Sequence, residues 1–532
     1  MAEVGRPPSS HHAIVFIGFM AAGKTRAAEA VAERLGLGVI DTDALLEKEL
    51  GESIASFFQR EGEAEFRRRE ERLVTSTLEA LAGQVGGPSS VVALGGGAIL
   101  SPKVRQALAD HLPVWCDVEE GVAWGRAASG SKRPLAADRD RFTQLFAQRR
   151  PLYESVARVI LPSQARDAAR PAAPWIAAML ATPAVRMVWA ESASGAYAAA
   201  VGEGAIGLLA GAAEVLPGDL PARTFCIADS EALSHHSRLL PRREATIEVE
   251  GAESSKTIAE AERVLRQLAD AGARRDDCVL ALGGGVVGDL GGFCAATYQR
   301  GVPLIQAPTT LVAQVDSAYG GKTGVDLPEA KNYVGAYHLP IAVLADPTTL
   351  ETLPGNELAA GFVEVVKTAL IAGGSLWDRV RAIEALDPGS LREVIFDCAR
   401  TKIEVVASDE RDTGRRAVLN LGHTVGHAIE AQTGYSRYRH GEAVGLGLLA
   451  ALRLSGAEAL RNEVEGLLAS HGLPISLDPG VDTEAVMEAV GRDKKRTSEG
   501  LGFVLLERPG EPRWGERVEP DRVRAAVLEL SR

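Results

Sequence analysis

Short apolar runs alternate with longer amphipathic segments along the first part of the chain. Residues 13–18 (AIVFIG) predict a buried strand, and the segment RAAEAVAERL after them, which ends at Gly36, predicts a helix. Similar apolar runs predict strands at 37–41, 91–95 and 113–118, with helical patterns between them. Because strands and helices alternate, we expect an α/β fold built on a parallel sheet.

The pattern changes between residues 163 and 185, where the chain holds three prolines and many alanines. We interpret this stretch as the end of one domain and a short linker, with a boundary near residue 182. A second α/β series follows, and beyond about residue 350 the segments are mostly amphipathic and helical. The strands expected in this series lie at 224–229, 278–283, 304–308 and 341–346, and its clearest helix lies at 257–270.

Composition narrows the class of protein. The chain has 532 residues, of which 46% are apolar, so several domains with ordinary cores are expected. The net charge of −13 argues against general nucleic-acid binding, which uses a basic face, but it permits local Lys and Arg clusters for small anions.

Five cysteines without CxxC spacing favour a reducing compartment over a disulfide framework or a thiolate zinc site. The sequence also lacks a signal-peptide pattern and an apolar run of the ~20 residues that span a membrane, so we expect a cytoplasmic protein without a membrane partner.

The segment GFMAAGKT (18–25) matches the phosphate-binding pattern GxxxxGK[ST]. It lies between a predicted strand and a predicted helix, which is the context that the pattern requires. Backbone N–H groups of such a loop bind phosphates together with the helix N-terminus. Lys24 is expected to reach the β and γ phosphates and Thr25 to bind Mg²⁺. The loop therefore predicts a nucleoside triphosphate site but does not identify the acceptor.

Ordered motifs after this loop suggest the acceptor. They are DTD (41–43), FRRRE (66–70), LGGGA (94–98), SKRPL (131–135) and RRPLY (149–153). Together with the loop, they make residues 13–165 resemble shikimate kinase, which implies ATP- and Mg²⁺-dependent phosphorylation of shikimate. Ala21 departs from this resemblance, because a glycine is common at that position of the family's loop.

The resemblance also implies individual roles. Asp41 corresponds to the carboxylate that holds Mg²⁺ through water, and Asp43 to the group that orients or deprotonates the attacking hydroxyl. Arg67 and Arg149 correspond to arginines that pair in bidentate fashion with the shikimate carboxylate. The other matched positions are Gly18, Ala21, Ala22, Gly23, Arg126 and the lid residue Arg133 for ATP, and Gly95, Gly96 and Gly97 for shikimate.

Two weaker signals occur in the second part of the chain. The stretch LGGGVVGD (282–289) follows a predicted strand and fits GxGxxG, a dinucleotide pattern that is unspecific by itself. His423 and His427 share one face of a predicted helix, and His440 and Glu364 complete a set of three imidazoles and one carboxylate, typical of Zn²⁺. Spacing alone leaves open which histidine is not a ligand, and also whether one is simply a core residue.

Longer stretches of the second part match a known family in order. They are ESSKT (253–257), GGGVVGDLGGF (283–293), YQRG (298–301), PTTLVAQVDSAYGGKTGVD (308–326), KNYVGAYHLP (331–340), EVVK (364–367), RRAVLNLGHTVGHAIE (415–430), RHGEAV (439–444) and RDKK (492–495). The chain from about residue 185 onward therefore resembles 3-dehydroquinate synthase. The resemblance implies that Glu364, His423 and His440 hold Zn²⁺ or Co²⁺, with His427 on the substrate side.

The same resemblance implies the remaining site residues. The NAD⁺ site is expected to contain Asp229, Glu253, Lys256, Gly284, Gly285, Asp289, Thr309, Thr310, Asp316, Lys322 and Lys331. The substrate is expected to contact Lys322, Asn332, Lys367, Lys402, Arg416, Asn420 and one of Lys494 and Lys495. Arg300 corresponds to an arginine that reaches the neighbouring subunit's site, so a homodimer through this half is expected.

The implied reaction converts 3-deoxy-D-arabino-heptulosonate 7-phosphate to 3-dehydroquinate and phosphate, with NAD⁺ regenerated in each turnover. The chain is thus expected to be a bifunctional enzyme of the shikimate pathway. The alternatives are another sugar-phosphate cyclase or a polyol dehydrogenase in the second half, or a non-catalytic nucleotide-binding module in the first. Since two other steps separate the two reactions, no direct handover of an intermediate is expected.

These observations predict an α/β chain of five segments. In order, they are a flexible tail (1–12), a shikimate kinase-like P-loop domain with a parallel sheet (13–165), a terminal helix and linker (166–184), a Rossmann-like NAD-binding domain (185–348) and a mostly helical metal- and substrate-binding domain (349–532).

Overall fold

The computed structural model describes residues 12–83, 90–129, 138–163, 167–215, 220–221, 223–493 and 502–531. Residue contacts divide the chain into two compact units: Met1–Ala190 with Ala198–Ala222, and Glu191–Tyr197 with Arg223–Arg532. The chain therefore enters the second unit briefly, returns to the first, and enters the second again at Arg223. The boundary near residue 182 stays a prediction about where one enzyme ends, because compact units are defined by contacts alone.

The first unit is built on a sheet with strand order β2-β3-β1-β4-β5-β6-β7. The pairs from β2 through β6 are all parallel, as expected for strands joined by helices. All four residues of β1 are buried, which is the pattern of a strand covered on both faces. The strands are β1 (Ile14–Ile17), β2 (Gly38–Asp41), β3 (Ser90–Ala93), β4 (Leu112–Asp117), β5 (Val159–Pro162), β6 (Arg186–Glu191) and β7 (Ala196–Val201).

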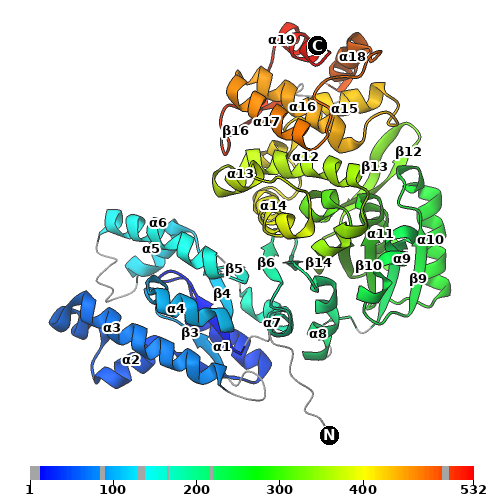
Figure 1. Cartoon of the computed structure of the whole chain (residues 1–532). Helices are drawn as coiled ribbons and strands as arrows, with labels where there is room; N and C mark the ends of the chain where they lie inside the picture. Colours follow the sequence, from blue (N-terminus) through cyan, green and yellow to red (C-terminus); the bar gives the residue numbers. More distant parts are fainter. Residues whose placement is uncertain are drawn as a thin grey trace. The chain divides into compact units, whose positions relative to one another are not determined.

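Helices join these strands (Figure 1). They are α1 (Lys24–Leu35), α2 (Thr42–Leu50), α3 (Ile54–Ala82), α4 (Pro102–Ala107), α5 (Glu120–Ser129), α6 (Arg139–Val156), α7 (Ala169–Ala178) and α8 (Leu208–Val215). Because parallel strands end at the same edge of a sheet, the segments that follow β1, β2 and β3 meet there. The phosphate loop, the Asp41–Asp43 segment and the glycines after β3 are thereby brought together.

The second unit begins with five strands that pair in parallel in the order β14-β11-β10-β8-β9. Val264 of α10 and Leu290 of α11 pack with Phe225, Ile247 and Leu304 of the strands in one apolar core. The elements are β8 (Thr224–Asp229), α9 (Ser230–His236), β9 (Ala245–Val249), α10 (Ile258–Asp270), β10 (Cys278–Gly283), α11 (Gly285–Thr297), β11 (Leu304–Pro308), the hairpin β12 (Lys322–Leu327) and β13 (Ala330–Tyr337), and β14 (Ala342–Ala345).

The rest of the second unit is mostly helical, with α12 packed against α14 and α16 (yellow-green to orange in Figure 1). Thirteen of the 18 residues of α12 are buried, and the charged side chains of Glu364 and Lys367 are among them. The helices are α12 (Gly355–Ala372), α13 (Gly374–Val380), α14 (Pro388–Ser408), α15 (His423–Gln432), α16 (His440–Leu454), α17 (Glu458–Ser470), α18 (Thr483–Asp493) and α19 (Pro520–Glu529).

These elements confirm the predicted class, an α/β fold with parallel sheets followed by a helical part. The sequence did not predict two antiparallel hairpins, β12–β13 and the pair β15 (Phe503–Leu506) and β16 (Pro512–Glu516). No described helix is both long and apolar enough to cross a membrane.

Candidate active sites

The phosphate loop of the first unit has the backbone conformation that its glycines permit. Gly18 and Gly23 have φ values of 148° and 83°, and a Cβ on Gly18 would lie 2.8 Å from the Cys116 carbonyl oxygen. Ala21 also has a left-handed backbone, with φ 60°. This conformation costs an alanine roughly 1 kcal/mol of backbone strain that a glycine would not have. Lys24 donates a hydrogen bond to the Phe19 carbonyl at 3.1 Å.

The two predicted Mg²⁺ residues lie side by side. Thr25 Oγ1 donates to Asp41 Oδ2 at 2.7 Å. The other Asp41 oxygen accepts from the backbone N–H groups of Asp43 and Ala44 at 2.9 and 3.1 Å, which caps α2. A hydroxyl and a carboxylate at the edge of a phosphate loop are hard oxygen donors of the type that Mg²⁺ prefers.

The acceptor side of this site is built around the glycines after β3. A Cβ on Gly95 would lie 2.5 Å from Asp43 Oδ1, and one on Gly97 would overlap the Arg67 guanidinium. Arg67 donates to Glu70 at 2.5 Å, and burial raises the pKa of Glu70 despite the opposing attraction of Arg67. Glu70 is the last residue of the FRRRE motif, and the motif alone did not predict a role for its side chain.

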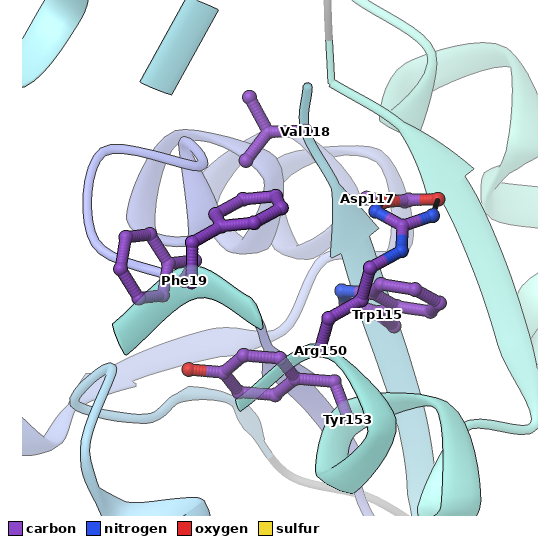
Figure 2. A pocket seen from close by; sticks show the side chains of 7 residues that line it. Phe19, Trp115, Asp117, Val118, Arg150 and Tyr153 are labelled. Carbon is purple, nitrogen blue, oxygen red and sulfur yellow. Dashed lines mark hydrogen bonds and ion pairs between the residues drawn. The ribbon is translucent and has the colours of Figure 1, made fainter. Parts of the chain in front are cut away.

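Three further arginines of the first unit differ in their surroundings. Arg149 is buried and donates to the Gly96 carbonyl at 3.4 Å. Its neighbour Arg150 instead pairs with both oxygens of Asp117, at 2.7 and 2.9 Å, beside a small pocket lined by Phe19, Trp115 and Tyr153 (Figure 2). Arg126 lies 3.4 Å from the Ala21 carbonyl. The predicted lid residue Arg133 lies outside the described residues.

In the second unit, three helices bring together Glu364, His423 and His440. The His440 and His423 Nε2 atoms lie 3.4 and 3.7 Å from Glu364 Oε1, and one donor atom from each of the three residues lies within 4.8 Å of the others. Glu364 is 1% exposed, and its other oxygen, Oε2, lies 2.5 Å from Lys367 Nζ. A buried carboxylate that faces two imidazole Nε2 atoms fits a divalent metal with three protein ligands.

The Nδ1 atoms of both histidines are already engaged. His423 Nδ1 lies 3.2 Å from the Leu421 carbonyl, and His440 Nδ1 lies 3.2 Å from Glu430 Oε2. Each Nε2 is therefore the atom that faces Glu364. Glu430, which is 6% exposed, was not selected from the sequence. Glu430, His427 and His440 also form a second group of possible ligands, so geometry alone does not exclude His427.

Charge and burial set the protonation of these groups. Burial, reinforced by the positive charge of Lys367, lowers the pKa of His423 to about 3. The imidazole is therefore neutral, which is the form that binds a metal. Burial opposes charge on Glu364 as well, but the attraction of Lys367 and His440 holds the pKa of this carboxyl well below its usual range. For His440, burial is outweighed by hydrogen bonds to Glu364 and Glu430, and the pKa rises to about 10.

The buried Lys367 and the half-buried Lys402 lie beside this set. Lys367 is 2.5 Å from Glu364 Oε2 and 3.1 Å from Asp316 Oδ2, and Lys402 bonds to the other Asp316 oxygen. Burial opposes the charge of Asp316, but the two lysines lower its pKa overall. The structure thus places Asp316, which was predicted for the NAD⁺ site, between two residues predicted for the substrate.

The predicted nucleotide residues gather at the carboxyl ends of β8, β10 and β11. A Cβ on Gly284 would lie 2.9 Å from Thr310 Cγ2, so the glycine loop packs closely there. Asp229 caps α9, and Lys256 pairs with Asp289 at 2.7 Å. Other neighbours in this group are Thr309, whose N–H bonds to the Gly283 carbonyl, Gly285, which packs on Ser317, and Lys331, which lies 3.4 Å from Glu253.

The remaining predicted substrate residues are more dispersed. Lys322 pairs with Asp412 at 2.6 Å, and Asp412 was not selected from the sequence. Arg416 is buried, Asn420 is exposed at the end of a short 3₁₀ turn, and Asn332 has a left-handed φ of 55°. Lys494 and Lys495 lie outside the described residues.

The two units together define a nucleotide-dependent phosphotransferase fold followed by an α/β and helical enzyme fold with a metal centre. Family models agree with this division: shikimate kinase matches residues 20–179, and the N- and C-terminal parts of 3-dehydroquinate synthase match residues 246–360 and 361–496. The chain belongs to the 3-dehydroquinate synthase family and carries a shikimate kinase domain before it.

Individual relatives support this assignment. The 3-dehydroquinate synthase of Halorhodospira halophila is 41% identical over 348 residues, covering 62% of this chain and 94% of the relative. That of Symbiobacterium thermophilum is 44% identical over 298 residues, covering 54% and 83%. Among solved structures, 2-epi-5-epi-valiolone synthase from Streptomyces hygroscopicus, with NAD⁺ and Zn²⁺ bound, is 26% identical with a TM-score of 0.55, covering 59% of this chain and 92% of that one.

Proposed function

We propose that the chain is a bifunctional enzyme that phosphorylates shikimate with ATP and Mg²⁺ and converts 3-deoxy-D-arabino-heptulosonate 7-phosphate to 3-dehydroquinate. The observation that carries the larger half is the buried Glu364 with two imidazole Nε2 atoms facing it, next to Lys367. Zn²⁺ and NAD⁺ would supply Lewis-acid and hydride chemistry there, as both are bound in the related valiolone synthase.

The chain's own residues support the roles proposed for the synthase. Glu364, His423 and His440 would hold the metal. Lys367 and Lys402 would place positive charge beside the substrate's oxygens in a buried site, where charge is poorly screened. Nucleotide binding would fall to the glycine loop at 283–288, Asp229 and the Lys256–Asp289 pair.

The kinase roles rest on the first unit's geometry. Thr25 and Asp41 would hold Mg²⁺, and Asp43 would face the acceptor hydroxyl beside Gly95. Arg67 and Arg149 would bind the shikimate carboxylate, with bidentate pairing as the reason for guanidinium groups.

Assembly and location are part of the same proposal. Arg300 is exposed and adopts a left-handed φ of 70° next to Gln299 at 48°, and such backbone strain in non-glycine residues concentrates at functional sites. This supports a homodimer in which Arg300 reaches the partner's site. All five cysteines are buried and free, which supports a reducing compartment such as the cytoplasm.

The deciding experiment measures phosphate release from 3-deoxy-D-arabino-heptulosonate 7-phosphate by the full-length protein. The expected result is release that requires NAD⁺, is lost on chelation, returns with Zn²⁺, and yields no net NADH. A metal-loaded protein without release would contradict the assignment, and activity on another heptulose 7-phosphate would then favour another cyclase. Shikimate-dependent ADP formation, lost in Asp43→Asn, tests the kinase half against a non-catalytic nucleotide-binding module.

A further inference from the structure

The turn between β6 and β7 belongs to the second unit, although the residues on either side of it belong to the first. It is closed by a hydrogen bond from the Ser192 N–H to the Gly195 carbonyl at 2.9 Å. The three family models match residues 20–179, 246–360 and 361–496, so none of them covers this turn. Two series of contacts within the second unit, called routes below, connect this turn with Arg416.

The first route passes through Glu410. The Ser194 N–H donates to Glu410 Oε2 at 2.9 Å, and the Ser194 hydroxyl donates to Oε1, so one serine engages both carboxylate oxygens. Burial opposes the charge of Glu410, but the hydrogen bonds from Ser194 and Ser192 lower its pKa overall. The carboxylate is therefore ionised and held by the turn.

Glu410 in turn holds the guanidinium of Arg416. The Glu410 backbone carbonyl accepts from Arg416 Nη1 at 2.6 Å. Asp409 fixes the same loop from its other end, because its Oδ2 accepts from the N–H groups of Gly414 and Arg416 at 2.7 and 3.0 Å. Arg416 is only 3% exposed, so the position of this loop decides where its side chain lies.

The second route passes through Tyr197. This side chain is 3% exposed, and its hydroxyl is hydrogen-bonded to the backbone of Gly320. Gly320 has φ 87°, and a Cβ placed on it would lie 2.8 Å from Arg416 Nη2. The Gly320 backbone therefore packs directly on the guanidinium, on a segment separate from Glu410.

We propose that Ser194, Glu410 and Tyr197 are positioning residues that fix the Arg416 guanidinium in the geometry that binds the substrate's carboxylate. The inference rests on the proposed synthase function, in which Arg416 contacts that carboxylate. Bidentate guanidinium–carboxylate pairing depends on orientation, so a guanidinium that is fixed before binding loses less freedom when the substrate arrives.

Kinetics of the full-length, NAD⁺- and Zn²⁺-loaded protein test this inference. Ser194→Ala, Tyr197→Phe and Glu410→Gln should each raise the KM for 3-deoxy-D-arabino-heptulosonate 7-phosphate by about 3- to 10-fold, with kcat within about 2-fold, as expected for loss of one hydrogen bond in a binding network. Ser194→Ala combined with Glu410→Gln should be no worse than Glu410→Gln alone, because the two residues act on one route.

Inorganic phosphate, which has no carboxylate, separates positioning from general damage. Its inhibition constant should stay unchanged in all variants, Ser194→Thr should retain the wild-type KM, and Ser470→Ala serves as the matched control on α17. An unchanged KM, or an equal loss of phosphate affinity, would overturn the inference. A wild-type protein that releases no phosphate would instead overturn the proposed function and the inference with it.

Discussion

In two histidines of the synthase half, His423 and His440, the Nδ1 atom is hydrogen-bonded within the protein. The Nε2 atom of each is therefore the one that can bind a metal. A backbone carbonyl orients His423, whereas the Glu430 side chain orients His440. A carboxylate in this position sets the tautomer of the imidazole and increases its basicity as a ligand. Glu430 should therefore influence metal binding although it does not face Glu364.

Replacing Glu430 by alanine is expected to weaken Zn²⁺ binding by about 10- to 100-fold, because His440 loses the group that orients it. Competition against a chromophoric chelator measures this affinity on the full-length protein. NAD⁺ affinity should not change, and Glu465→Ala at a half-buried position of α17 provides a control. Unaltered Zn²⁺ affinity in Glu430→Ala would show that His440 binds the metal equally well without the carboxylate that contacts its Nδ1 atom.

Gly97→Ala is expected to raise the KM for shikimate at least ~10-fold, because the added methyl group must displace the Arg67 guanidinium. The KM for ATP should stay within about 2-fold, since the phosphate loop is not touched. Gly121→Ala is the matched control, because a Cβ there meets nothing within 4 Å. Equal losses for shikimate and ATP would mean that the substitution damages the whole unit.

At the scale of elements, the C-terminal hairpin is fastened to the helix that carries Glu364 and Lys367. The Gly510 N–H in the hairpin turn donates to the Leu370 carbonyl of α12 at 2.8 Å. Gly373, directly after α12, has φ 67°, and a Cβ on it would lie 2.7 Å from the Gly510 Cα. Two glycines are therefore needed where helix and hairpin meet.

Gly373→Ala is expected to destabilise the second unit by about 2–4 kcal/mol, as backbone atoms must move apart. Gly374→Ala is an informative comparison, because φ there is 54° but the Cβ would meet nothing within 4 Å. It should cost only about 1 kcal/mol, the usual strain of a left-handed alanine. Chemical denaturation of the NAD⁺-bound protein measures both, and equal effects would contradict a steric role for the contact.

Contiguous apolar runs made most of the sheet strands predictable. The strands at β1, β2, β3, β4, β8, β10, β11 and β14 were all expected from the sequence. The β12–β13 hairpin was missed because most residues of β13 are exposed or half-buried, so no apolar run marks it. Among site residues, Ser194 and Glu410 are 216 positions apart, and local spacing carries no signal for such a contact. The predicted site residues came from family motifs, which say little about the side chains that hold them in place.

At the scale of the whole molecule, the residues proposed for the kinase site and those proposed for the synthase site lie in different units, so the two activities should be separable within the intact chain. Lys24→Ala is expected to reduce shikimate phosphorylation more than ~100-fold and to leave phosphate release by the synthase within about 2-fold. His423→Ala should do the reverse. Both activities can be measured on the same preparation, and a change in the synthase's KM in Lys24→Ala would reveal coupling between the halves.

The path of the chain between the units has a consequence for dividing the protein. A cut before residue 191 takes β7 and α8 away from the first unit, and a cut at residue 222 leaves Ser194 and Tyr197 on the fragment without Arg416. No single peptide bond therefore releases two fragments that each keep all the contacts of one unit. For the gene, this means that a coding sequence divided at any single position encodes at least one product that lacks part of its compact unit.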